Sequence, residues 1–380
     1  MKSNWKMVPL GNVCEIKNGY AFKSKDFSPY GIPVIKIKNV KPNQIITNDF
    51  SYVPEAIANA KSKWLISKDE ILLTMTGNRA DGSPESWVGK AARFTLDGKH
   101  LLNQRVSAIK SSSDELDTEY LGYYLSSWES QLYFIKHSNS SGGQANISPT
   151  IVKEYNILLP PIDKQKQIVS ILRSLDDKIE LNNKINENLE QQAQALYQNL
   201  FIDNADSEWQ QGHLSDLITV RYGKDHKKLS DGVYPVFGSG GLMRKVERPL
   251  YDKESVLIPR KGTLNNVIYI NEPFWTVDTM FYTEMKQPNV AKFVYHFVKS
   301  KDLASMNAGS AVPSMTTDIL NALELNIPDN TTLEKFENIV APMYAAMQNN
   351  RQESTKLAEL RDKLLPLLMT GKIDVSSLSL

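Results

Sequence analysis

Apolar residues recur in alternating steps of four and three along residues 162–201. The stripe passes through Ile168, Leu172, Leu175, Ile179, Asn182, Asn186, Leu189, Ala193, Leu196 and Leu200. This spacing is that of a coiled-coil seam, and the tract from Asp163 to Phe201 contains neither glycine nor proline. The pattern predicts one helix about 55–60 Å long. Such a helix needs a partner, because packing stabilises most helices in water.

The same pattern occurs again near the end of the chain. A shift of 168 positions without a gap aligns Pro160 with Pro328, Ile168 with Phe336, Leu172 with Val340, Leu175 with Met343, Ile179 with Met347, Asn182 with Asn350, Leu189 with Leu357, Leu196 with Leu364 and Leu200 with Leu368. The stretch before each helix also repeats: Trp5, Leu10 and Gly19 match Trp209, Leu214 and Gly223 at a shift of 204. Two copies of a module, a globular unit followed by a long helix, therefore make up the chain.

The repeats predict four segments: a first globular domain at 1–155, a first spacer helix at 156–205, a second globular domain at 206–327 and a second spacer helix at 328–380. The predicted fold class is α+β, with two similar α/β domains separated by two long coiled-coil helices and related by an internal pseudo-twofold repeat. Two helices of equal length, each following its own domain, are expected to pack antiparallel.

Asparagines interrupt both apolar stripes. If the helices overlap fully, Asn186 faces Asn350 and Asn182 faces Ser354. A buried polar pair lowers stability but penalises slipped registers, because a slip would place an amide against leucine. The alternative is that Asn182 and Asn186 lie on a hydrated edge.

Shorter patterns predict the elements of the globular domains. The stretch Ile32–Asn39 alternates apolar and basic residues, which predicts a half-exposed strand with Lys36 and Lys38 on its polar face. A buried strand is predicted at Glu70–Met75, and a helix with core aromatics at Tyr120–Phe134. The second domain repeats this order more loosely at Val233–Phe237, Ser255–Pro259 and Phe293–Lys299.

Charge adds a weak preference for anionic ligands at the domains. The formal net charge is only +1. Lys and Arg minus Asp and Glu gives +4 for residues 1–155 and +2 for 209–328, against −4 for 156–208 and −1 for 329–380. Anionic ligands are therefore expected at the domains rather than at the helices.

Neither an export signal nor catalytic chemistry is indicated. The N-terminus has no apolar signal segment and no apolar run approaches 18 residues, so a cytoplasmic protein is expected. Cys14 is the single cysteine and is expected to be a buried bystander. P-loop, dinucleotide and nucleophile-elbow motifs and the amino-methyltransferase tetrad are absent, and the five histidines lack metal-ligand spacing. The chain is therefore predicted to be non-catalytic, without a metal or cofactor of its own.

Three segments resemble type I restriction-modification specificity subunits: Gly143–Pro149, Leu159–Gln165 and Leu360–Ile373. Through the duplicated order the resemblance covers the full chain; Lys164 stands where a glutamate is common before the glutamine. The resemblance implies two target-recognition domains, each reading one half of a bipartite, gapped double-stranded DNA site. A spacer of roughly 50 Å would correspond to about one and a half turns of B-DNA.

The resemblance also implies partners. Two methyltransferase (M) subunits would modify adenine N6 with S-adenosylmethionine, and restriction (R) subunits, where present, would use ATP and Mg²⁺. The methyltransferase helices are expected to pack against the spacer helices, with Gln165, Arg173 and Arg361 at the rim of that contact. The alternative is that these three are ordinary solvated side chains.

Candidate DNA-binding residues are the basic and amide side chains of the domain loops, because Arg and Lys bind phosphate or guanine and Asn and Gln pair with adenine. They are Lys23, Lys36, Lys38, Asn78, Arg79, Arg105, Gln144 and Asn146 in the first domain, and Arg221, Lys224, Lys227, Arg244, Arg260, Lys261 and Asn265 in the second. Arg79 and Arg260 are placed in corresponding loops beside Gly77 and Gly262. Gln144 and Asn146 are expected, on balance, to tie their loop to the first spacer helix.

Two other functions stay open. One is a coiled-coil scaffold that assembles proteins without touching DNA, which the loss of DNA activity on altering the domain loops would exclude. The other is an enzyme whose site has no recognisable motif, which a single-turnover assay of the isolated chain would reveal.

Overall fold

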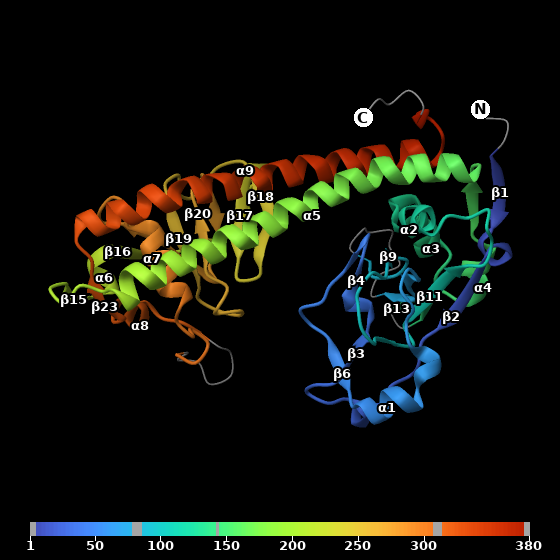
Figure 1. The fold of residues 1–380 in the computed structure, drawn as a ribbon, viewed down its shortest axis with the longest axis horizontal. Coiled ribbons are helices and arrows are strands. Elements are labelled where there is room, and N and C mark those ends of the chain that lie inside the picture. The colour runs from blue at the N-terminus through green and yellow to red at the C-terminus, as the bar shows by residue number, and fades with distance from the viewer. Residues whose placement is uncertain (1–4, 78–85, 142–143, 307–313, 376–380) are drawn as a thin grey trace. The chain divides into compact units, whose positions relative to one another are not determined.

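The computed structural model describes residues 5–77, 86–141, 144–306 and 314–375 (Figure 1). The chain divides into two compact units, one formed by residues 1–180 with 353–380 and the other by residues 181–352. Each unit contains one globular domain and parts of the two long helices, α5 (Ile162–Gln198) and α9 (Asn330–Met369).

Both predicted long helices are present. α5 has 37 residues and α9 has 40, which corresponds to about 55 and 60 Å. α5 continues into a π-helical turn at Asn199–Asp203. Within the first unit the two helices lie side by side and antiparallel (Figure 1), with Arg361 2.7 Å from Asp176 and Lys178 3.5 Å from Glu353.

The asparagines of the two stripes meet in the second unit. Asn350 Nδ2 donates to Asn186 Oδ1 at 2.9 Å, which is the pairing expected from the full overlap. Asn182 Nδ2 donates to the Asn350 carbonyl at 3.4 Å, and Asn186 Nδ2 to the Met347 carbonyl at 3.3 Å. Asn182 is 0% and Asn186 9% exposed, so the hydrated-edge alternative is wrong. Ser354 lies on α9, in the part that belongs to the first unit.

The first domain is built from small sheets. A four-stranded antiparallel sheet has the order β2 (Cys14–Asn18), β11 (Val106–Ser111), β7 (Ile71–Thr74), β9 (Ala91–Arg93). A three-stranded sheet has the order β10 (Leu101–Leu102), β3 (Ile32–Ile35), β6 (Ser51–Val53), in which β10 and β3 are parallel. The remaining pairings are β1 (Lys6–Pro9) with β14 (Asn156–Leu159), β4 (Val40–Lys41) with β5 (Gln44–Ile45), and β13 (Gln144–Asn146) with both β12 (Asn139–Ser141) and β8 (Thr76–Gly77).

Short helices complete this domain. They are α1 (Glu55–Ala60), α2 (Thr118–Ser126), α3 (Trp128–Lys136) and α4 (Pro149–Glu154), with 3-10 turns at Leu10–Asn12, Ser24–Asp26, Ile37–Asn39 and Ser62–Trp64. The strand β7 is fully buried, and Tyr120 on α2 is 0% exposed, as expected for a core aromatic. Cys14 is buried as predicted, and burial raises the pKa of its thiol to about 12.

The second domain repeats the arrangement. Its four-stranded sheet has the order β16 (Ile218–Tyr222), β22 (Met280–Met285), β19 (Ser255–Pro259), β20 (Ile268–Ile270). Its three-stranded sheet has the order β18 (Gly241–Val246), β17 (Asp231–Gly238), β21 (Trp275–Thr276), in which β17 and β21 are parallel. β15 (Gln210–His213) pairs with β23 (Glu324–Ile327), and the helices are α6 (Leu214–Leu217), α7 (Ala291–Lys299) and α8 (Thr317–Asn321).

The internal repeat is therefore confirmed in the sheets themselves. It extends to a close approach that only glycine permits: a Cβ on Gly19 would lie 2.1 Å from the Asn103 carbonyl oxygen, and one on Gly223 2.1 Å from that of Val277. The next residue makes the same bond in both domains. Tyr20 N donates to Leu102 O at 2.8 Å, and Lys224 N donates to Thr276 O at 2.9 Å.

Two predicted elements of the first domain are wrong in detail. The strand at Ile32 ends at Ile35, and Lys36 and Lys38 do not share a strand face. Asn39 ends the strand: its Oδ1 accepts from Lys36 N at 3.0 Å, while its Nδ2 donates to Ile46 O and Asp49 O. The helix predicted at Tyr120–Phe134 is two helices, because Ser127 ends α2 and caps α3 by accepting from Ser130 N.

Gln165 is also not where the resemblance placed it. It is 0% exposed, so it is not at the rim of a partner contact. Its Nε2 donates to Glu115 O and Pro160 O at 2.7 and 2.8 Å, and its Oε1 accepts from Asp117 N at 2.8 Å. Gln165 thus ties the first turn of α5 to the segment before α2. Arg173 is 56% exposed, and Arg361 pairs with Asp176.

Among the described residues, every helix is too short or too polar to cross a membrane.

Candidate nucleic-acid interface

One end of the four-stranded sheet carries some of the candidate residues in both domains, and this end is called the sheet edge here. In the first domain Met75 N donates to Arg105 O, and Ile147 N donates to Met75 O, both at 2.9 Å. In the second, Arg260 N donates to Thr279 O and Met315 N donates to Arg260 O, both at 2.8 Å. The loop after β7 or β19 therefore meets the loop before β11 or β22 in the same way.

This hydrogen bonding defines which residues are equivalent. Arg260 occupies the position of Met75, and Gly262 occupies that of Gly77. The two loops correspond as predicted. Asn78 and Arg79 lie outside the described residues.

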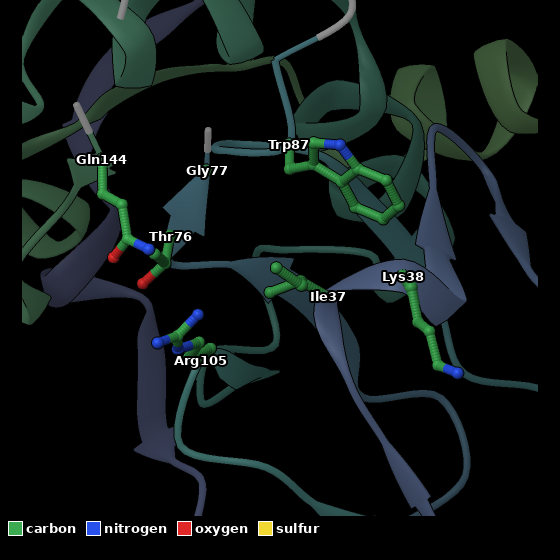
Figure 2. Close-up of a pocket in the computed structure, with 7 residues that line it drawn as sticks. All are labelled: Ile37, Lys38, Thr76, Gly77, Trp87, Arg105 and Gln144. Carbon is green, nitrogen blue, oxygen red and sulfur yellow. The ribbon is translucent and has the colours of Figure 1, made fainter. Parts of the chain in front are cut away.

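A pocket of about 260 Å³ opens at this edge in the first domain (Figure 2). It is lined by Ile37, Lys38, Thr76, Gly77, Trp87, Arg105 and Gln144. Lys38, Arg105 and Gln144 are candidate residues that lie far apart in the sequence and that the fold brings together. Trp87 is a lining residue that the sequence analysis missed. The sequence signal that could have found it is a tryptophan that directly follows a polar stretch of sequence at 82–86.

Gln144 and Asn146 have different surroundings although both lie on β13. Gln144 is exposed and points into the pocket (Figure 2). Asn146 Oδ1 accepts from Thr76 Oγ1 at 3.0 Å, which joins β13 to β8. Asn146 thus has a structural role, but its partner is β8 rather than the predicted spacer helix, whereas Gln144 is available to a ligand.

The lysines near the pocket are held by the domain. Lys38 Nζ lies 2.6 Å from Asp49, and Lys36 Nζ lies 3.9 Å from the centroid of the Phe27 ring. Burial and the neighbouring Lys38 lower the pKa of Lys36, and Asp49 partly opposes this. Lys23 is exposed at the start of its 3-10 turn.

In the second domain Arg260 lies over an exposed aromatic ring. Its guanidinium carbon is 5.3 Å from the centroid of Tyr222, a residue that is 52% exposed, and its Nη1 donates to Asp278 O at 3.2 Å. Lys261 is exposed beside it, and its main chain forms an isolated antiparallel β-bridge with Ser314. Arg221, next to Tyr222, pairs with Glu284 at 3.1 Å.

The other candidates of the second domain divide into two groups. Lys224 and Lys227 are exposed on the loop between β16 and β17. Arg244 donates to Leu229 O at 2.7 Å and lies 3.2 Å from Asp231. Asn265 uses both ends of its amide, on Asp302 at 3.0 Å and Ala304 N at 2.9 Å. Arg244 and Asn265 are therefore committed to contacts within their own domain.

Within the described ranges, no group of three or more His, Cys, Asp or Glu side chains is arranged to hold a metal ion.

Comparison with known proteins identifies the family. A family model described as the type I restriction modification DNA specificity domain matches residues 2–191 and 206–358. The MjaIX specificity subunit of Methanocaldococcus jannaschii is 24% identical over an alignment of 308 residues that covers 70% of this chain and 71% of that protein. The HindI specificity subunit of Haemophilus influenzae is 22% identical, over 98% of this chain and all of that protein (100%).

A solved structure has the same fold. The crystal structure of a type I restriction-modification S subunit from M. genitalium superposes with a TM-score of 0.58 at 18% identity, covering 97% of this chain and 98% of that one. Two repeated domains and two long helices are thus the fold of a known specificity subunit. The chain belongs to the family of type I restriction-modification DNA specificity proteins.

Proposed function

We propose that each globular domain of this chain reads one half of a bipartite, gapped DNA site, and that the chain directs its partner subunits to that site. One observation carries the proposal: the two domains present the same sheet edge with different side chains. The first offers Arg105, Gln144 and Trp87, and the second offers Arg260 and Lys261. A common framework with different exposed groups suits two readers of different sequences.

The side chains at these edges suit duplex DNA. Arginine presents donors that match guanine in the major groove, a role that suits Arg260 of the second domain. Exposed lysines such as Lys224 and Lys227 suit contacts with phosphate, which fix register without reading sequence. DNA is therefore favoured over a purely protein-binding scaffold.

The partners follow from the family. We propose two methyltransferase subunits that modify adenine N6 with S-adenosylmethionine and, where present, restriction subunits that use ATP and Mg²⁺. The chain itself would be non-catalytic and would act in the cytoplasm, where the DNA is. The buried Asn186–Asn350 pair would hold the register of α5 against α9 and so the gap between the half-sites.

The test is the methylome of a methylation-free host that expresses this chain with the methyltransferase encoded beside it. We expect N6-methyladenine at one gapped, two-part motif, and none when this chain is omitted. Absence of new methylation, with both proteins soluble and associated, would instead support the scaffold.

A domain exchange sharpens the test. Replacing residues 209–328 with the matching segment of a relative of different specificity should change one half of the motif and leave the other half as it was. The matched control is the exchange of the first domain, which should change only the opposite half. A motif that changes in both halves after a single exchange would contradict independent reading.

A further inference from the structure

The pocket of the first domain has two unlike walls. Figure 2 shows the polar ends of Gln144, Thr76 and Arg105 grouped on one side, with the Trp87 ring and Ile37 opposite them. The volume is about 260 Å³, whereas pockets for drug-sized ligands measure about 300–1,000 Å³. The pocket is therefore suited to a small group with one flat apolar face and one polar edge.

A nucleobase has this chemistry and a phosphate does not. The indole ring is a stacking surface for a base, and the Gln144 amide with the Arg105 guanidinium supplies donors and an acceptor for its edge. A phosphate would leave the Trp87 wall without a favourable contact. The ammonium of Lys38 is already 2.6 Å from Asp49 and points away from the pocket in Figure 2.

The Trp87 ring is held in place by its own domain. Lys41 Nζ lies 4.4 Å from the ring centroid, and Lys41 is not among the residues that line the pocket. The main chain next to Trp87 packs closely against β8, because a Cβ on Gly77 would lie 2.5 Å from Val88 N. A ring positioned in advance binds a base with little loss of side-chain freedom.

A base within the duplex cannot use this wall, because both of its faces are covered by neighbouring base pairs. A methyltransferase, however, must extrude its target base from the stack, which leaves the opposite base without a partner. We propose that this unpaired base also leaves the stack and is bound by the Trp87 pocket, stacked on Trp87 and read by Gln144 and Arg105. The inference rests on the proposed function, in which the extruded base is adenine and the unpaired base is thymine.

The test uses the complex of this chain with its methyltransferase, and a duplex carrying the motif found in the methylome. Trp87→Ala should weaken binding to intact DNA about 5- to 150-fold, the range for loss of one base stacked on an aromatic ring. When the thymine opposite the methylated adenine of one half-site is replaced by an abasic residue, wild type and Trp87→Ala should bind equally. The thymine of the other half-site should show no such coupling.

Two further variants separate stacking from folding. Trp87→Phe keeps a ring and should retain most of the affinity. Trp128→Ala removes a tryptophan that is 40% exposed on α3 and does not line the pocket, and it should bind like wild type.

The outcomes also separate this inference from the proposed function. If Trp87→Ala weakened binding equally to intact and abasic DNA, or did not weaken it at all, the proposed role of the pocket would be refuted. Sequence-specific methylation by the wild-type complex would continue in that case. A wild-type complex that selects no sequence would instead refute the proposed function.

Discussion

Replacing Asn350 with leucine tests whether the buried asparagine pair sets the helix register. The substitution removes the 2.9 Å bond to Asn186 and leaves Asn186 Oδ1, on a side chain that is 9% exposed, without that donor. Loss of a partner for a buried polar atom lowers the free energy of unfolding by about 1–3 kcal/mol. Asn350 is itself half-buried, so water relieves part of this, and we expect about 1–2 kcal/mol.

The double variant Asn186→Leu/Asn350→Leu should behave differently. It leaves neither amide of the pair unsatisfied, and apolar replacement of both partners is often neutral or stabilising. We therefore expect it to lose less stability than the sum of the two single variants. Because a leucine pair no longer penalises a slip, the same variant should methylate sites with more than one gap length.

Urea unfolding followed by circular dichroism at 222 nm measures the stability part, and the methylome measures the gap. Gln352→Leu, an exposed change on the same helix, is the control and should alter the free energy of unfolding by no more than about 0.5 kcal/mol. A double variant whose loss equals the sum of the single losses, together with a single unchanged gap, would refute the register role.

Three other predictions follow from single side chains. Gln165→Leu should lower the free energy of unfolding by about 2–4 kcal/mol in thermal unfolding, because one buried and two part-buried main-chain groups lose their partner. Exposed Gln167→Leu should change little, and similar losses for both variants would contradict this. Arg260→Ala should weaken binding roughly 5- to 100-fold and relax one position of the half-site read by its domain; an unchanged methylome motif would remove it from the base-reading residues. Burial, aided by Lys299, lowers the pKa of His296 to about 4. In the unfolded chain this histidine binds a proton at a higher pH than in the folded chain. The free energy of unfolding should therefore fall by up to about 3 kcal/mol as the pH drops from about 6.5 to 4. Urea midpoints across this range should show a weaker slope for His296→Gln, and an equal slope would exclude His296 as the cause.

The two long helices could be predicted because the spacing of apolar residues along the chain depends only on local helix geometry. The four-and-three spacing specifies one face of α5 and α9, and full overlap then places Asn186 opposite Asn350. The buried strand at Ile71–Thr74 was predictable for the same reason, since its apolar run needs no distant residue to be recognised. Patterns of this kind depend only on neighbours in sequence.

The errors came from side chains whose partners are distant main-chain groups. Asn39 ends a strand early because its amide reaches the carbonyls of Ile46 and Asp49. Gln165 is a polar residue on a polar helix, and it is buried because its amide forms hydrogen bonds with Glu115 O and Asp117 N. Neither contact leaves a periodic signal in the sequence.

The candidate site shows the same division. Residue type alone selected Arg105 and Gln144 from the first domain, but only the folded sheets bring them to one pocket and add Trp87. Residue type also selected Arg244 and Asn265, whose hydrogen-bonding groups the domain uses internally. Chemistry in the sequence thus names candidates, and the fold decides which of them remain available to a ligand.

The two domains show why the side chains at this sheet edge can differ while the fold stays the same. The bonds that close the edge are main-chain bonds: Met75 N to Arg105 O in one domain, and Arg260 N to Thr279 O in the other. A main-chain bond places no demand on the side chain, so methionine and arginine occupy the same position. The Met75 side chain is buried, at 5% exposure, whereas Arg260 extends over Tyr222. Specificity can therefore reside in side chains that the sheet positions but does not need.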